Sequence, residues 1–195
     1  MARIEVIKSA RKERKCSKCG NTIAVGQSYY KATPYRRPTI YRCTTCGLKS
    51  YETSGSEFVR EVGSIVENWG DSFGVCETTA DEITSVLEEL RDQTQENLDN
   101  MPGQLQGGDT GMMLQERIEM LEDTISELEN VSWENCECDA RDEVLNEMGE
   151  FDPDAEDSEW ETESDYNEDL DSRVSEITEQ KFSDAIDEAL SGLSY

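Results

Sequence analysis

Four cysteines in the first quarter of this 195-residue chain have the residue type and the spacing of metal ligands. Cys16 and Cys19 form one Cys-x-x-Cys pair, Cys43 and Cys46 form a second, and a glycine follows each pair directly. A glycine there lets the backbone curl so that its amides face the sulfurs and support their negative charge. Four thiolates with no open position favour a tetrahedral, structural Zn²⁺, because a catalytic zinc keeps a position for water. We therefore expect one structural zinc ion on these four cysteines.

Other interpretations of the cysteines remain open at this point. A rubredoxin-like iron site is the alternative to zinc, because four thiolate ligands alone do not separate the two metals. A redox Cys-x-x-Cys would begin a helix within a βαβ pattern, which the sequence lacks. Cys76, Cys136 and Cys138 would need a fourth ligand, such as a carboxylate, to form a second metal site. We interpret these three as ordinary reduced cysteines, which are typical of a reducing cytosol.

The segments that must position the four ligands are short and rich in β-branched and aromatic residues. Residues 22–31 and 38–42 are two such runs, and they predict a small antiparallel hairpin between the two cysteine turns. Ile4, Val6 and Ile7 indicate a short strand that leads into the hairpin.

With CSKCG and CTTCGL on strand ends, this segment resembles a zinc ribbon. The opening MARIEVIKSARKERKCSKCG is similar to small zinc-ribbon proteins of tailed viruses of bacteria and archaea. The resemblance covers residues 1–50 only, and it implies a small β domain built around one zinc ion.

Charge divides the chain into two very different parts. The formal net charge is −27. Through Ser50 the chain has twelve Lys and Arg against Glu5 and Glu13, a balance of +10, whereas the rest has six basic and 43 acidic residues, a balance of −37. A basic module favours a polyanionic partner, and an acidic body favours a basic protein surface.

Basic residues of the ribbon are the candidates for contact with nucleic acid. They alternate with Tyr29, Tyr30, Tyr35 and Tyr41, and guanidinium groups and aromatic faces together suit a phosphate backbone and exposed bases. The alternative is that the tyrosines fill the small core of the ribbon and that residues 9–18 form a solvated, flexible arm. The candidate contacts are Arg14, Lys15, Lys18, Lys31, Arg36, Arg37 and Arg42.

Residues 54–148 are expected to form an acidic helical region. A capping box of Ser54 and Glu57 precedes an apolar stripe of helical spacing, which Trp69 closes and Gly70 ends. The first helix is therefore predicted to stop at this glycine.

Two longer helices are predicted next. A second capping box, Thr79 with Glu82, opens a helix to about residue 100, and after a breaker-rich loop over residues 101–109 a further helix runs from about 110 to 130. Their heptad-like stripes predict either an antiparallel hairpin or a dimeric coiled coil, which leaves a homo-oligomer open.

The last part of the chain begins with an acidic stretch. Residues 149–169 contain no Lys or Arg, so we expect a disordered acidic linker, because such a segment repels itself. An amphipathic helix over residues 170–193 is predicted to follow. The expected fold class is thus a small β zinc ribbon followed by an all-α acidic region with a disordered acidic segment.

Nothing in the sequence predicts catalysis. The chain has no histidine, no phosphate-cradling glycine loop and no nucleophile elbow, and the expected metal has no open position. We therefore expect a non-enzyme. No apolar run approaches the length of a membrane span and no secretory h-region follows Met1, so the prediction is a cytoplasmic protein without a membrane partner, in the host cytoplasm if the source is viral.

Two functions fit these features. The first is an accessory or regulatory factor whose basic ribbon contacts nucleic acid or a nucleic-acid-processing protein. The second is an acidic interaction protein, namely a mimic of DNA that occupies a host target, a coiled-coil adaptor or a virion component, in which the zinc ribbon is purely structural. A further explanation concerns habitat: an acidic excess of this size is also typical of proteins in concentrated salt, where screening removes self-repulsion.

Overall fold

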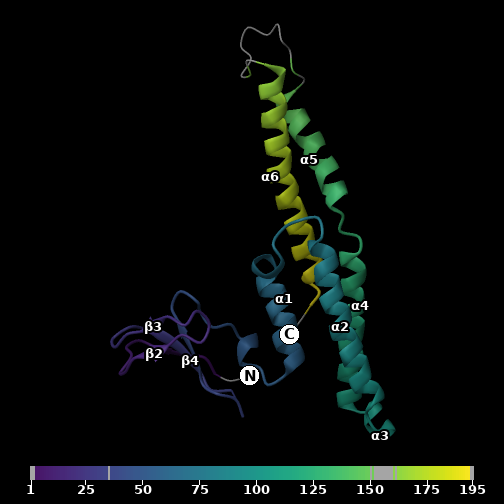
Figure 1. Ribbon diagram of the computed structural model, residues 1–195. Coiled ribbons are helices and arrows are strands. Elements are labelled where there is room, and N and C mark those ends of the chain that lie inside the picture. The colour runs from purple at the N-terminus through teal and green to yellow at the C-terminus, as the bar shows by residue number, and fades with distance from the viewer. Residues whose placement is uncertain (1–2, 35, 150, 152–159, 161, 194–195) are drawn as a thin grey trace. The chain divides into compact units, whose positions relative to one another are not determined.

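A computed structural model describes residues 3–34, 36–149, 151, 160 and 162–193. The chain divides into two compact units, a ribbon unit of residues 1–68 and a helical unit of residues 69–194 (Figure 1). The sequence predicted that the ribbon module ends at residue 50. The compact unit is longer because the segment after the second cysteine pair packs back onto the strands.

Five short strands form the ribbon unit. Three of them make one antiparallel sheet in the order β1-β4-β5, and the other two, β2 and β3, pair as a separate antiparallel hairpin. Their bounds are β1 Glu5–Ile7, β2 Arg14–Lys15, β3 Thr22–Ile23, β4 Tyr29–Ala32 and β5 Ile40–Cys43.

The predicted hairpin between the two cysteine turns is confirmed as the β4–β5 pair, in which Tyr30 lies opposite Arg42. The predicted strand before the ribbon is confirmed as β1, which pairs with β4 so that Glu5 lies opposite Lys31. The run over residues 22–31 is not continuous. It turns at Gly26, whose φ of 91° is in the left-handed region that favours glycine.

After β5, the 3-10 helix η1 (Tyr51–Thr53) and the start of α1 (Glu57–Phe73) complete the ribbon unit. The predicted capping box of Ser54 and Glu57 is wrong by two residues. The Ser56 hydroxyl instead accepts from the amide of Val59 at 3.4 Å, and the Ser54 hydroxyl accepts from the amide of Ser56 at 3.1 Å. A serine lies at both positions, so composition alone does not separate the two caps.

Helix α1 passes beyond its predicted end at Gly70. Its backbone leaves helical geometry at Asn68 (φ −141°, ψ 17°), where the ribbon unit ends, and then continues to Phe73. The residue that ends it is Gly74, with a φ of 77°, whose amide donates to the carbonyl of Gly70 at 3.0 Å. Gly70 keeps a helical backbone, so the helix can pass through it. Gly74 has a positive φ, a conformation that favours glycine and ends the helix.

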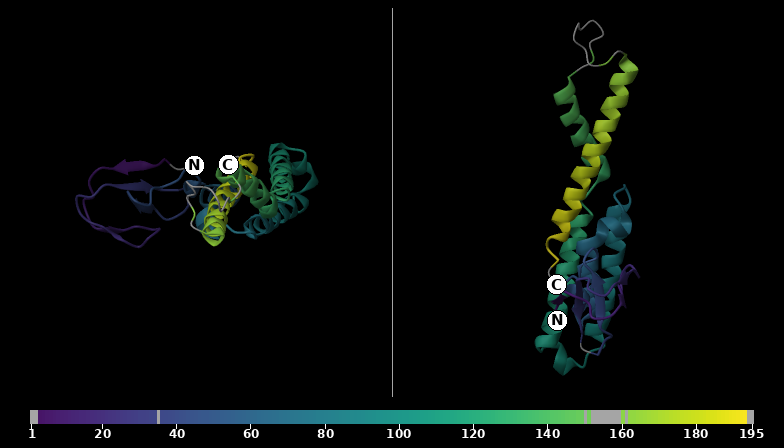
Figure 2. Two further views of the ribbon diagram at one scale, coloured as in Figure 1. Left: turned by 90° about the horizontal axis from the view of Figure 1, so that it is seen from above. Right: turned by 90° about the vertical axis from the view of Figure 1, so that its left-hand side faces the viewer.

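Two helix pairs make up the helical unit. Helices α2 and α4 lie side by side with the short α3 between them in sequence, and α5 lies along α6 (Figures 1 and 2). The bounds are α2 Thr79–Asp99, α3 Gly103–Gln106, α4 Asp109–Leu128, α5 Trp133–Met148 and α6 Glu163–Leu190. Of the two predicted arrangements, the structure has the hairpin within one chain. No helix in the described ranges is both long and apolar enough to cross a membrane.

Apolar side chains spaced along one face hold each pair together. In the first pair Leu87 and Leu121 are fully buried, and in the second Val144 and Phe182 are. Contacts between α4 and α6 join the pairs into one unit. The heptad-like stripes of the sequence are therefore packing surfaces, as their spacing predicts.

The start of α6 differs from its prediction. The helix begins at Glu163 and not at residue 170, because Thr162 and Asp165 form a capping box and Tyr166 is buried among apolar residues. The disordered linker was predicted over residues 149–169, and ten of these 21 residues (150, 152–159 and 161) lie outside the described residues. The part from residue 163 onward is helical, which corrects the prediction there.

Candidate metal centre

The two cysteine pairs adopt the same turn. In the first, the Gly20 amide donates to the Cys16 carbonyl at 3.0 Å, and in the second the Gly47 amide donates to the Cys43 carbonyl at 3.1 Å. The two glycines have φ values of 73° and 64°. A side chain would be strained in this left-handed conformation, which explains why glycine follows each pair. The first turn joins β2 to β3, and the second follows β5 directly.

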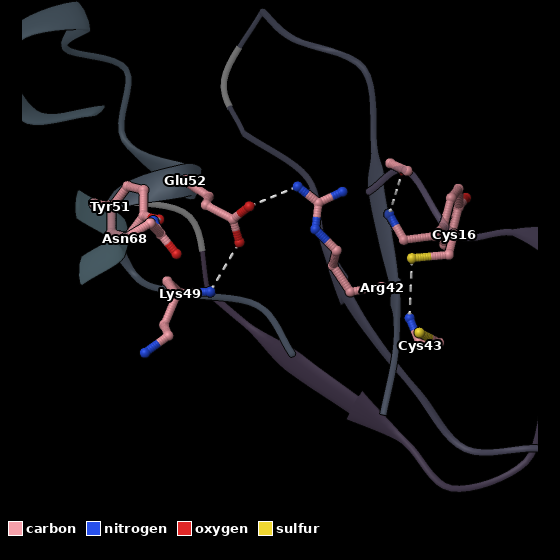
Figure 3. A network of polar contacts seen from close by, with 9 residues as sticks. Cys16, Arg42, Cys43, Lys49, Tyr51, Glu52 and Asn68 are labelled. Atoms are coloured by element: carbon pink, nitrogen blue, oxygen red, sulfur yellow. Dashed lines mark hydrogen bonds and ion pairs between the residues drawn. The ribbon is translucent and has the colours of Figure 1, made fainter. Parts of the chain in front are cut away.

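Two cross-strand hydrogen bonds bring the turns together. The Ser17 amide donates to the Tyr41 carbonyl at 2.7 Å, and the Cys43 amide donates to the Cys16 Sγ at 3.5 Å (Figure 3). As a result the four Sγ atoms of Cys16, Cys19, Cys43 and Cys46 all lie within 4.8 Å of one another. The sequence-predicted ligand set therefore converges on one point.

This geometry suits a tetrahedral ion. Metal–sulfur bonds of about 2.3 Å in a tetrahedron separate neighbouring sulfurs by about 3.8 Å. The Cys19 and Cys43 Sγ atoms are 3.8 Å apart. Cys16 is buried with Ala10, Ile23 and Tyr29, so one ligand also belongs to the small apolar core. The residues present fit a single thiophilic metal ion.

The pKa values of Cys16, Cys43 and Cys46 are shifted in different directions. Burial raises the pKa of Cys16, but hydrogen bonds from the backbone amides of Cys19, Cys43 and Lys18 outweigh it and bring that pKa down to about 6. The amide of Cys46 likewise lowers the pKa of Cys43. Interaction with the Cys43 and Cys19 side chains raises the pKa of Cys46 to about 12. Sulfurs this close cannot all be anionic without a cation, and a bound metal ion would remove this conflict.

The three remaining cysteines lie outside the metal-ligand cluster found in the described part of the chain. Among the described residues, the first four cysteines form the one group of His, Cys, Asp and Glu with ligand spacing. Cys76 and Cys138 are exposed and Cys136 is half-buried. The alternative of a second metal site finds no support in the described part of the chain.

Two of the seven candidate nucleic-acid contacts have structural partners inside the ribbon unit. Arg42 forms an ion pair with Glu52 at 2.5 Å, with side chains only 12% and 18% exposed (Figure 3). Arg37 donates to the carbonyl of Ser54 at 3.2 Å. Both contacts hold the segment after β5 against the strands, so these arginines contribute to folding.

The other candidates lie on the surface. The Arg14 guanidinium stacks over the Tyr41 ring at 4.2 Å, and Lys31 pairs with Glu5 at 3.2 Å. Lys15, Lys18 and Arg36 are exposed.

The described tyrosines of the ribbon are at least partly buried, as expected if they fill its small core. Tyr29 is buried, and its ring lies 6.0 Å from that of the half-buried Tyr41. Tyr30 is also half-buried, and Tyr35 lies outside the described residues.

One groove of the ribbon unit is lined by two of the sequence-predicted contacts and by three further cations. Arg14 and Lys31 line a groove of about 570 Å³ together with Lys8, Arg11 and Lys12. The dense basic run before the first cysteine indicated Lys8, Arg11 and Lys12 in the sequence. Their position near Lys31 depends on the pairing of β1 with β4, which the sequence does not show.

Comparisons with protein-family models, curated proteins and solved structures give no match for this chain. The site geometry and the charges therefore carry the functional argument.

Proposed function

We propose that this protein is a non-enzymatic, zinc-binding accessory or regulatory factor whose basic ribbon contacts nucleic acid or nucleic-acid machinery. The observation that carries the proposal is the convergence of four cysteine sulfurs within 4.8 Å in a unit rich in Lys and Arg. A closed four-thiolate site has no position for substrate or water, so it serves to order the ribbon. In a domain with so small an apolar core, metal binding contributes much of the folding free energy.

Charge supports the assignment of the ribbon as the contacting surface. Residues 1–68 contain thirteen Lys and Arg against six Asp and Glu, a net charge of +7, whereas residues 69–195 contain five against 39, a net charge of −34. A cationic unit on an otherwise anionic chain runs against the overall composition. It suits a polyanion, for which each phosphate contact adds affinity.

The resemblance of residues 1–50 to zinc ribbons of tailed viruses supports a viral source and hence the host cytoplasm as the place of action. The same resemblance supports zinc over iron as the bound ion.

Metal analysis and nucleic-acid binding together test the proposal. The full chain, purified without chelator, is expected to contain one zinc per molecule. It is also expected to bind labelled single- or double-stranded nucleic acid with an affinity that falls as salt rises. The absence of both zinc and iron would overturn the metal assignment, and the absence of any binding in dilute salt would overturn the nucleic-acid assignment.

A second function is favoured by the helical unit. Its net charge of −34 gives a large anionic surface, which suits a basic protein partner, such as the DNA site of a host protein. A stoichiometric complex with a purified DNA-binding protein, dissociated by salt and competed by DNA, would support this function. This result would favour the second function over the first only if the ribbon also fails to bind nucleic acid directly.

A further inference from the structure

A basic groove on the ribbon unit has none of the four cysteines in its lining. It has a volume of about 570 Å³ and lies along β1 and the segment that follows it. Of the described residues that line it, five are cationic and none is acidic. These five, the groove residues, are Lys8, Arg11, Lys12, Arg14 and Lys31.

The segment that carries the first three groove residues is fixed to the ribbon by its backbone. Ala10 is buried, its amide donates to the Gln27 carbonyl at 2.8 Å, and its carbonyl accepts from the Gly26 amide at 2.8 Å. Lys8, Arg11 and Lys12 are therefore held near one another on an ordered turn. A basic surface that is ordered before binding loses less conformational entropy when it meets its ligand.

The remaining two groove residues come from paired strands. The Cζ atom of Arg14 lies over the Tyr41 ring, 4.2 Å from its centroid, and this cation–π contact positions the guanidinium. Lys31 faces the groove from β4, and its pairing with Glu5 at 3.2 Å offsets part of its charge. Among the described residues, the other four groove cations form no ion pair, so the groove keeps a positive potential.

Apolar surface lies beside these cations. Val6 lines the groove and is 63% exposed, and Tyr29 and Ile7 complete its wall. Phosphate groups suit the cations, while an exposed aliphatic side chain suits the apolar faces of sugars and bases. A hollow of this volume is of the size that encloses a small organic ligand. It admits a flexible strand a nucleotide or two at a time, whereas a duplex is too wide to enter.

We propose that this groove binds the sugar-phosphate backbone of single-stranded nucleic acid, and that Arg11 and Lys12 are two of its phosphate contacts. The inference rests on the proposed function and makes it specific. It places the contact surface on the turn before the first cysteine pair and excludes Arg37 and Arg42, which do not line the groove and stabilise the fold.

A pair of charge-matched variants tests the groove. Arg11→Gln/Lys12→Gln removes two exposed cations from the groove. Lys15→Gln/Lys18→Gln removes two exposed cations that the sequence also suggested as contacts but that do not line the groove, so the proposal excludes them. Each zinc-loaded full chain is titrated against a labelled single strand of about 12 nucleotides, within the usual range of single-strand sites. The titration is repeated across a salt series and with a duplex of the same length.

The expected result is a large difference between the two variants. Loss of two phosphate contacts should reduce the salt slope by about 1.4, at about 0.7 per contact, and weaken binding on the order of tenfold in dilute salt. The control variant should lose less than about threefold. Wild-type protein should bind the single strand more tightly than the duplex. Equal metal content and equal unfolding midpoints in both variants ensure that the comparison concerns binding.

Other outcomes separate the two proposals. Equal weakening of both variants, or tighter binding of the duplex, would overturn the groove and leave the proposed function intact. Failure of the wild-type protein to bind any nucleic acid would overturn both.

Discussion

The ring of Tyr51 lies directly against Gly63 of α1. A Cβ at residue 63 would stand less than 3.0 Å from the Cβ, Cγ and Cδ1 atoms of the tyrosine. The Asn68 side-chain amide donates to the Tyr51 hydroxyl at 2.7 Å, so the ring is held at both its base and its tip. This contact attaches the start of α1 to the ribbon unit.

The substitution Gly63→Ala should therefore destabilise the protein although alanine favours helices. The added methyl group meets the body of a fixed ring, and such overpacking costs about 1–3 kcal/mol. Gly70→Ala in the same helix is the matched control, because nothing lies within 4 Å of its Cβ position and it should gain up to about 1 kcal/mol. Urea unfolding measures both. Equal stability of the two variants would show that the close contact is absent.

Replacement of one cysteine ligand should unfold the ribbon and leave the helices. Cys19→Ser is expected to abolish binding of the metal ion and to remove the amide-exchange protection of residues 3–50, because metal binding and folding are coupled in such small domains. The exposed Cys138→Ser serves as the control and should keep the metal. Elemental analysis and hydrogen exchange provide the two measurements. Retention of protection in Cys19→Ser would contradict a folding role for the ion.

Affinity for the metal should fall as the pH falls, in two stages. The pKa of Cys46 is about 12 without metal, so at neutral pH its thiol must release a proton for the metal to bind. The affinity should then change at least about tenfold per pH unit. Below about pH 6 the Cys16 thiol is also protonated, and the dependence should steepen. Competition with a chromophoric chelator from pH 5 to 8 measures this, and a flat profile would contradict it.

The Glu52→Gln substitution should destabilise the ribbon unit by about 3 kcal/mol. The Arg42 charge is buried beside it, and its Nε and Nη1 atoms have no hydrogen-bond partner among the described residues. Adding Arg42→Met should restore part of the loss, because the unpaired charge is then gone. Glu5→Gln breaks an exposed pair with Lys31 and should cost less than about 1 kcal/mol. A loss in Glu52→Gln no larger than in Glu5→Gln would show that the Arg42 pair is unimportant.

The helical unit should become more stable as KCl is added. At about 1 M salt the screening length falls to about 3 Å, which removes most repulsion among surface carboxylates. Thermal unfolding with and without KCl measures the effect. A melting temperature in dilute buffer equal to that in molar KCl would refute salt adaptation as the origin of the charge.

The cluster of four cysteines could be predicted from sequence because its determinants are local. Each Cys-x-x-Cys-Gly turn fixes its own geometry, and the strands between Cys19 and Cys43 only need to bring the two turns together. The long helices were predictable for the same reason, since Leu87 and Leu121 belong to regular apolar stripes. The groove could not be predicted, because Lys31 joins Lys8 only through the long-range pairing of β1 with β4.

Helix α5 shows where the helical pattern is too weak to read. Its fully buried residues are Ala140 and Val144, four residues apart, which is too small an apolar face to identify from composition. The cap at Ser56 and the early start of α6 at Glu163 were missed for a related reason. Several serines, threonines and carboxylates near each start satisfy the capping pattern equally well.

Three helices of the acidic unit, α2, α4 and α6, carry acidic residues in their first turn, at the positive end of the helix dipole. Asp81 and Glu82 occupy the first turn of α2, Asp109 that of α4, and Glu163 and Asp165 that of α6. No Lys or Arg occupies the last turn of these three described helices, so their carbonyl ends lack a covalently attached cation. A cation near these carbonyl ends has to come from the solution, so the stability of the three helices should depend on the ions in the medium.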